Sequence, residues 1–208
     1  MESVVLMPVK AFAAAKARLA AVLSPAERQA LARWSAARVV AAAGELPVFI
    51  ACDDEAVAEW AGQRGATVLW HPGVGLNAAV DRSVDDLHDR GAQRVVVAHG
   101  DLPRAHGLVG LARATPAGGV LLVPDARRDG TNVAVVDPAS GFRFAYGPGS
   151  FRRHCSLAID AGLPLRVHPD PLLALDLDTP SDLTHPLVQE VLPEWLPTNP
   201  ANPRQSLA

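Results

Sequence analysis

The chain has 208 residues, 49% of them hydrophobic and only 5% aromatic, so we expect one domain whose core is mostly Ala, Val and Leu. A net charge of −3 gives no basic surface for nucleic acid, and no apolar run approaches the roughly 20 residues of a membrane span. The two cysteines, Cys52 and Cys155, lack a metal-ligand spacing, which predicts reduced thiols. We therefore expect a cytoplasmic protein whose partners are neither nucleic acid nor membrane.

Short β-branched runs alternate with helical patterns, which is typical of an α/β fold with a mainly parallel sheet sandwiched by helices in three layers. The first strand is expected at residues 4–9. A long helix then begins at Ser24-Pro25-Ala26-Glu27, a capping box with proline at the first helical position. The later strands are expected at 48–52, 66–70, 94–99, 119–124, 132–137 and 165–167, and the later helices at 54–64, 76–89 and 149–161.

The domain organisation follows from the same pattern. Residues 1–192 are expected to form a single domain. Residues 193–208 contain four prolines and little periodicity, so we expect a poorly ordered tail there.

Three aspartates follow apolar runs that lie far apart in the sequence. Asp101 ends the stretch VVVAHGD, and Asp176 and Asp178 lie in LLALDLD, two positions apart, so that on a regular strand their side chains share a face. Ligands bind at the carboxyl ends of strands in α/β proteins, and clustered carboxylates there suit a hard cation such as Mg²⁺. The alternative for Asp178 is a turn or cap residue ahead of the Thr-Pro-Ser-Asp that follows it.

The basic residues are distributed unevenly. Only two of the 19 are lysines, and Lys10, Lys16 and Arg18 all follow the first predicted strand. Lysine is a compact point charge that suits a triphosphate, so we expect these three to contact one. The alternative is a solvated basic start to a helix.

Two further loops offer neutral donors for an anion. Asp129-Gly130 predicts a turn, and Thr131 follows it with a hydroxyl at the mouth of the next strand. Gly147 and Ser150 belong to a glycine-rich segment ahead of a helix, where free backbone N–H groups and the hydroxyl could bind an anion. A simple turn and an ordinary N-cap are the alternatives.

A third glycine-bearing turn, HPGVGLNAAV, contains Gly75 and Asn77. We expect it to approach a base or ribose, since the Asn77 amide could read a purine edge with paired hydrogen bonds. The remaining polar candidates have no metal-binding or triad spacing, and we expect them to support the structure or the neighbouring site residues. They are His71, His99 and His154.

Taken together and in this order, these elements resemble the 2-phospho-L-lactate / phosphoenolpyruvate guanylyltransferase family of coenzyme F-420 biosynthesis. The resemblance covers about residues 4–183 and rests on the ordered set of motifs. These are P-V-K-x5-K-x-R-L at 8–19, G-L-N at 75–77, G-D-L-P at 100–103, D-G-T-N at 129–132, G-P-G-S at 147–150 and L-D-x-D-T-P at 175–180.

The resemblance implies a nucleotide-diphospho-sugar-transferase-like fold and an enzyme that joins GTP to a small phosphorylated acid with release of pyrophosphate. It implies Mg²⁺ bound by Asp101, Asp176 and Asp178. It assigns Lys10, Lys16 and Arg18 to the triphosphate and, with Asp101, to catalysis; Gly75 and Asn77 belong to the nucleotide site. It assigns the small acid to Thr131, Gly147 and Ser150.

Two other functions stay open. One is another transferase of this fold, of the molybdenum-cofactor or glycosyltransferase type, although those nucleotidyltransferases have a glycine-rich first loop and residues 9–19 contain no glycine. The other is a non-catalytic nucleotide-binding regulator, which could dispense with the three acids. The expected partners are GTP and phosphoenolpyruvate, 2-phospholactate or 3-phosphoglycerate, and a homodimer is compatible with the sequence.

Overall fold

The computed structural model describes residues 2–197, and these form one seven-stranded sheet. The strands are β1 (Ser3–Pro8), β2 (Val48–Cys52), β3 (Thr67–Trp70), β4 (Arg94–Ala98), β5 (Val120–Pro124), β6 (Thr131–Val136) and β7 (Leu165–Val167). Their order is β3-β2-β1-β4-β6-β5-β7. All pairings are parallel except those of β6, which is antiparallel to β4 and β5. The predicted mainly parallel sheet is confirmed.

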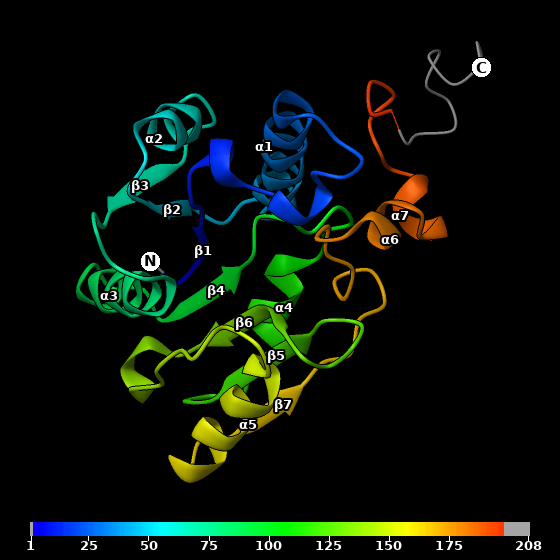
Figure 1. Cartoon of the computed structure of the whole chain (residues 1–208). Coiled ribbons are helices and arrows are strands. Elements are labelled where there is room, and N and C mark those ends of the chain that lie inside the picture. Colours follow the sequence, from blue (N-terminus) through cyan, green and yellow to red (C-terminus); the bar gives the residue numbers. More distant parts are fainter. Residues whose placement is uncertain (1, 198–208) are drawn as a thin grey trace.

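Helices cover both faces of this sheet, as Figure 1 shows. They are α1 (Pro25–Ala42), α2 (Glu55–Gly62), α3 (Leu76–Asp89), α4 (Leu108–Ala114), α5 (Ser150–Asp160), α6 (Pro180–Leu183) and α7 (Pro186–Gln189). The short 3-10 turns are η1 (Phe12–Ala14), η2 (Ala17–Leu19) and η3 (Pro138–Ser140). None of the described helices is long and apolar enough to cross a membrane.

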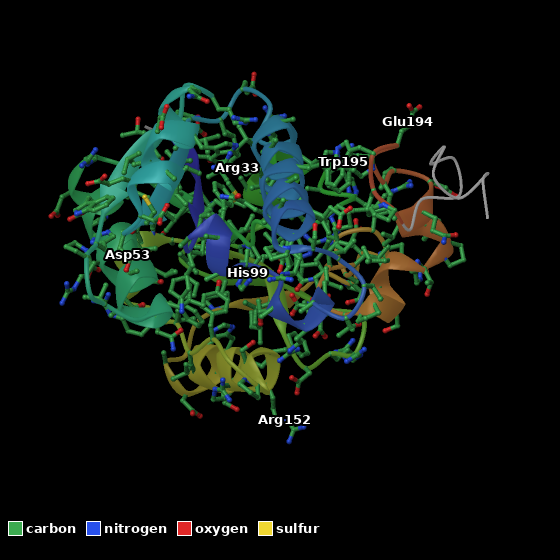
Figure 2. The ribbon with its side chains drawn as sticks, turned by 45° about the horizontal axis from the view of Figure 1, so that its top comes forward. Arg33, Asp53, His99, Arg152, Glu194 and Trp195 are labelled. Carbon is green, nitrogen blue, oxygen red and sulfur yellow. The ribbon has the colours of Figure 1, made fainter. Side chains whose placement is uncertain are left out.

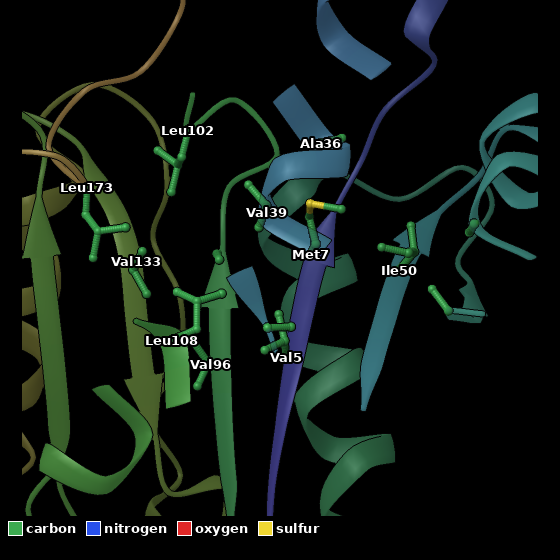
Figure 3. Close-up of a cluster of buried hydrophobic side chains, with 14 of the residues drawn as sticks. Val5, Met7, Ala36, Val39, Ile50, Val96, Leu102, Leu108, Val133 and Leu173 are labelled. Atoms are coloured by element: carbon green, nitrogen blue, oxygen red, sulfur yellow. The ribbon is translucent and has the colours of Figure 1, made fainter. Parts of the chain in front are cut away.

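The hydrophobic core lies on the two sides of the sheet, because alternate strand residues face opposite ways. One cluster packs the sheet against α1, α2 and α4, and the other packs it against α3 and α5. In Figure 3, Val5 and Met7 of β1 lie beside Ala36 and Val39 of α1. The three predicted layers are therefore present.

Local sequence signals set several helix boundaries. The Ser24 hydroxyl accepts from the Glu27 backbone N–H at 3.3 Å, and the Glu27 carboxylate accepts from the Ser24 N–H at 2.8 Å, which is the predicted capping box. Asp54 caps α2 by accepting from the Val57 N–H at 3.0 Å. The predicted helix at 54–64 is therefore present with a cap at its first residue.

Some elements differ from the prediction. Helix α4 was not predicted, because seven residues that include Gly110 show too little periodicity to indicate a helix. Asp176 and Asp178 do not lie on a strand; residues 176–178 have no regular secondary structure. The argument that a regular strand aligns these two side chains is therefore corrected.

The C-terminal part of the described chain packs as a small third cluster. Leu177, Leu183 and Leu196 are completely buried in it together with Leu19 and Leu31. Because Leu196 lies inside this cluster, the packed region extends past residue 192. The remainder of the predicted tail, 198–208, lies outside the described residues.

The strand order fixes where a ligand can bind. From β1 the chain moves outward to β2 and β3, and it then returns to β4 on the other side of β1. In such sheets a crevice opens at the carboxyl ends of the two central strands. The loops that follow β1 and β4 therefore meet at one edge of the sheet (Figure 1).

Candidate functional site

Two cavities lie at this edge of the sheet. The first, of about 520 Å³, is lined by residues that follow β1, β2 and β4, among them Lys10, Lys16 and Asp53. The second, of about 780 Å³, is lined by the β5–β6 loop, the start of α5 and residues 174–179. Leu76, His99 and Asp101 line both, and Figure 2 shows His99 near the centre of the molecule. This arrangement suits two ligands that meet at a shared wall.

Asp101, Asp176 and Asp178 form an acid cluster at that wall. One carboxylate oxygen from each lies within 4.8 Å of the other two. Asp101 follows β4, and its carbonyl oxygen accepts from the Leu177 N–H at 3.2 Å. This bond places the extended segment so that the residues on either side of Leu177 reach Asp101. The cluster is a set of hard oxygen donors of the kind that Mg²⁺ prefers.

Two side chains that were not predicted as site residues position the acidic segment. The Asp182 carboxylate accepts from the backbone N–H of Asp178 at 2.9 Å and from that of Thr179 at 2.6 Å. The Asn132 amide donates to the Leu173 carbonyl oxygen at 2.9 Å. The Thr179-Pro180-Ser181-Asp182 spacing of a capping box is the signal that could have identified Asp182.

Lys16 lies inside the acid cluster and also lines the first cavity. Its ammonium nitrogen is 2.9 Å from Asp101 Oδ2 and 3.3 Å from Asp178 Oδ1, and its side chain is 7% exposed. Burial lowers the pKa of Lys16, but the charges of Asp101 and Asp178 outweigh it and raise the pKa. The ammonium is therefore charged and offsets part of the cluster's negative charge.

Asp176 is the carboxyl of the cluster whose ionisation is disfavoured most. Burial, followed by the charges of Asp101, Asp178, Asp182 and Asp125, raises the pKa of Asp176 to about 7. For Asp101, burial also raises the pKa, but Lys16 and His99 outweigh it and hold the pKa below its ordinary value. Three carboxylates against one ammonium leave an excess of negative charge, so a divalent cation fits the cluster electrostatically as well as chemically.

Other basic residues lie around the cluster. Lys10 is exposed at the rim of the first cavity. Arg18 lines the second cavity, with its Nη1 atom 3.9 Å from Asp178 Oδ2 and its side chain 75% exposed. Arg127 also lines the second cavity, although it was not predicted as a site residue. The doublet Arg127-Arg128 beside the predicted turn is the signal that could have found it.

The structure places the Gly75–Asn77 turn differently from the prediction. Gly75 caps α3, and Leu76 lines both cavities. The Asn77 side-chain oxygen accepts from the Tyr146 N–H at 2.7 Å, and its amide nitrogen donates to the Tyr146 carbonyl oxygen at 3.3 Å. Both ends of the amide are engaged with backbone, so the proposal that Asn77 reads a purine edge is corrected: it ties α3 to the segment before α5.

Thr131, Gly147 and Ser150 all line the second cavity. Thr131 begins β6, and Ser150 begins α5. Gly147 has a φ of 122°, a conformation that glycine adopts without strain. The structure therefore brings together the three residues that were assigned to the small acid.

Three backbone N–H groups at the start of α5 already have protein acceptors. The Asp129 carboxylate accepts from the Gly149 N–H at 3.1 Å, and the Asp129 carbonyl oxygen accepts from the Phe151 N–H at 3.0 Å. The Ser150 N–H donates to the Gly147 carbonyl oxygen at 3.0 Å. Asp129 therefore occupies part of the predicted backbone anion site. Thr131 and Ser150 line the cavity and have side-chain hydroxyls.

The histidines are packed into the structure. His71 Nε2 lies 2.8 Å from the Ser83 hydroxyl. His99 is half-buried in the wall of both cavities, with its ring centre 4.8 Å from that of Tyr146, and burial lowers its pKa. His154 is completely buried beside Thr131, with 3.0 Å between its Nδ1 atom and the hydroxyl. A neutral histidine beside each cavity therefore supports the walls of the site.

Comparison with known families decides the class of protein. A family model described as "Guanylyl transferase CofC like" matches residues 3–190. The chain belongs to this family. It is therefore an enzyme, a nucleotidyltransferase of the guanylyltransferase type, as the sequence motifs predicted.

Curated members of the guanylyltransferase family match most of the chain. A phosphoenolpyruvate guanylyltransferase from Sphaerobacter thermophilus is 39% identical over 194 residues, covering 88% of this chain and 91% of that protein. One from Rubrobacter xylanophilus is 37% identical over 185 residues, covering 85% and 89%. A 2-phospho-L-lactate guanylyltransferase from Methanothermobacter thermautotrophicus is 30% identical over 195 residues, covering 88% and 83%.

Solved structures show the same fold at low sequence identity. A nucleotide-diphospho-sugar transferase from Desulfovibrio desulfuricans G20 has a TM-score of 0.74 at 17% identity and covers 100% of this chain and 96% of its own. A nucleotidyl transferase from Methanothermobacter has a TM-score of 0.63 at 16% identity, covering 88% and 94%. The nucleotide-diphospho-sugar-transferase-like fold predicted for this family is confirmed.

Proposed function

We propose that this guanylyltransferase joins GTP to phosphoenolpyruvate with the help of Mg²⁺ and releases pyrophosphate, as a step of coenzyme F-420 biosynthesis. The observation that carries the proposal is the acid cluster at the wall between two cavities, one for each substrate. The relatives at 39% and 37% identity are named for phosphoenolpyruvate, which supports this acceptor over 2-phospho-L-lactate, the alternative.

We assign the nucleotide to the first cavity. Its walls are mostly small apolar side chains, which suit a planar base, and its polar groups include Lys10, Lys16 and Asp53. The two lysines lie on the loop after β1; Lys10 is at the rim of the cavity, and Lys16 contacts the acid cluster. A triphosphate that extends from this cavity toward Asp101 therefore meets cations along its length.

We assign the phosphorylated acid to the second cavity. Thr131 and Ser150 supply hydroxyl donors, and Arg18 and Arg127 supply positive charge for a carboxylate or phosphate.

The reaction follows from this placement. A phosphate oxygen of the acid forms a bond to the α-phosphorus of GTP as the bond from that phosphorus to the β-phosphate oxygen breaks. Asp101, Asp176 and Asp178 would hold Mg²⁺, which supplies charge neutralisation between the two reacting anions. Lys16 and Arg18 add fixed positive charge beside the cluster. A phosphate monoester is already nucleophilic at neutral pH, so positioning and charge compensation suffice.

The proposal is tested by offering the enzyme GTP and Mg²⁺ with separate acceptors. We expect phosphoenolpyruvate to give pyrophosphate and a product whose ³¹P NMR spectrum contains a new phosphoanhydride linkage. 2-Phospholactate and 3-phosphoglycerate are expected to react less well, and mannose 1-phosphate to react least. Faster turnover with mannose 1-phosphate than with all three acids would overturn the acceptor assignment.

A further inference from the structure

His154 is a buried histidine behind Thr131 in the second cavity's wall, and the proposed reaction does not use it directly. It lies on α5, is 0% exposed, and packs against the rings of Phe144 and Tyr146 with centre-to-centre distances of 5.9 Å and 4.9 Å. Both of its nitrogens have hydrogen-bond partners. One of these is the Thr131 hydroxyl, which lines the cavity.

The partners of His154 determine which nitrogen carries the proton. The backbone N–H of Ala145 donates to Nε2 at 2.9 Å, so Nε2 is an acceptor and carries no hydrogen. The Arg153 guanidinium donates to the carbonyl oxygen of Ala145 at 2.8 Å, and this second hydrogen bond fixes the Ala145 backbone. Burial, with the charges of Arg153 and His99, lowers the pKa of His154 to about 4, so the ring is neutral at pH 7. The one ring proton is therefore on Nδ1.

This tautomer determines the direction of the next hydrogen bond. Nδ1–H donates to the Thr131 hydroxyl oxygen at 3.0 Å. A hydroxyl that accepts from the ring keeps its own proton for another partner. Thr131 lines the second cavity, where the backbone N–H groups of Gly149 and Ser150 already have protein acceptors. The Thr131 proton is thus a donor available to an anion in that cavity.

We propose that His154 is a positioning residue that presents the Thr131 hydroxyl as a hydrogen-bond donor to the anionic acceptor in the second cavity. The inference rests on the proposed function, since it concerns how the acceptor of that reaction is bound. It assigns the direction of two hydrogen bonds: His154 donates to Thr131, and Thr131 donates to a phosphate or carboxylate oxygen. A neutral relay of this kind favours anions over ligands that offer only donors.

Two amide substitutions separate the two hydrogen bonds of His154. The amide of asparagine reaches the position of Nδ1, so His154→Asn keeps a donor for Thr131 and loses the acceptor for Ala145. The amide of glutamine reaches the position of Nε2, so His154→Gln keeps the acceptor for Ala145 and loses the donor for Thr131. His88→Gln, at an exposed position near the end of α3, is the matched control.

The measurements are KM for phosphoenolpyruvate, KM for GTP, and Tm for each variant. Loss of a hydrogen bond to a charged group is expected to raise KM for phosphoenolpyruvate by roughly tenfold or more in His154→Gln, with KM for GTP unchanged. His154→Asn is expected to keep KM for phosphoenolpyruvate near the wild-type value, even where its Tm falls. An unchanged acceptor KM in His154→Gln, or equal increases in both variants, would overturn the proposal.

A double-mutant cycle with Thr131→Val provides the second readout. If His154 acts through the hydroxyl, His154→Gln is expected to have no further effect on the acceptor KM once that hydroxyl is gone. An undiminished effect in the Thr131→Val background would contradict the relay. A wild-type enzyme that fails to use either phosphorylated acid would refute the proposed function, whereas an active wild type with additive variants refutes only the role of His154.

Discussion

Lys16 has a left-handed backbone conformation, with φ of 58° and ψ of 37°, which costs on the order of 1 kcal/mol for a residue with a side chain. This conformation accompanies the two ion pairs that join it to Asp101 and Asp178, which are 85 and 162 positions away. The sequence predicted that Lys16 supplies positive charge to the site. Its partners were not predictable, because they depend on how distant loops meet.

Replacing Lys16 tests whether its ammonium and a metal share the same oxygens. We expect Lys16→Met to lower Tm without Mg²⁺, because the carboxylates then repel one another without compensation. Added Mg²⁺ is expected to raise the Tm of Lys16→Met more than that of wild type, since the metal no longer competes with the ammonium. Lys10→Met, at the exposed rim, is the control. Equal Mg²⁺-induced increases in Tm would contradict the shared-oxygen account.

At the scale of elements, the strands and long helices were predictable because their apolar residues repeat with the period of the element. The direction of β6 follows from its short link to β5, which allows a hairpin but no crossover. Helix α4 was too short to show a period, and segment 176–178 owes its place to hydrogen bonds with Asp101 and Asp182 rather than to a strand. Tertiary contacts of this kind leave no local pattern.

The link between α3 and residue 146 gives a prediction that separates two roles for Asn77. The amide makes two hydrogen bonds to the Tyr146 backbone, so Asn77→Ala is expected to lower the free energy of unfolding by about 1–3 kcal/mol. KM for GTP should change little. Chemical unfolding and initial rates provide the measurements, and Gln63→Ala on exposed α2 surface is the control. Normal stability with a large rise in KM for GTP would restore the base-reading role.

At the scale of the whole molecule, the sheet brings the two cavities together at one edge. The buried His154 behind the second cavity makes the free energy of unfolding depend on pH. His154 has its pKa lowered to about 4 from an ordinary value of 6.5. Below 6.5 the unfolded chain binds a proton at this position that the folded protein does not bind, so acid favours unfolding. This contribution to stability is present above about pH 6.5 and is lost progressively as pH falls toward 4.

The pH dependence is expected to be shallower in a variant without the imidazole. We expect the free energy of unfolding of wild type to fall more steeply than that of His154→Gln between about pH 6.5 and pH 4. Urea titrations at several pH values within that window measure both slopes. The carboxylates that titrate there are common to both proteins, so the difference isolates His154. Parallel slopes would contradict a neutral buried ring.

The residue types of the acid cluster and of the small-acid site were predictable from the order of the motifs. Two features could not be predicted, because they depend on how distant segments meet in the assembled fold. Asp101 lies beside Asp176 and Asp178, and Asp129 binds the N-terminus of α5. We propose that this cluster holds the metal on which guanylyl transfer depends.

The most direct test is the Mg²⁺ dependence of pyrophosphate release from GTP and phosphoenolpyruvate in wild type and Asp176→Asn. Charge stabilisation is usually the largest catalytic term, so we expect the variant to fold normally and lose roughly 100-fold or more in kcat. Wild-type activity should be saturable in Mg²⁺ and abolished by a chelator. Near-normal turnover in Asp176→Asn, or transfer that proceeds unchanged without divalent cations, would contradict the account.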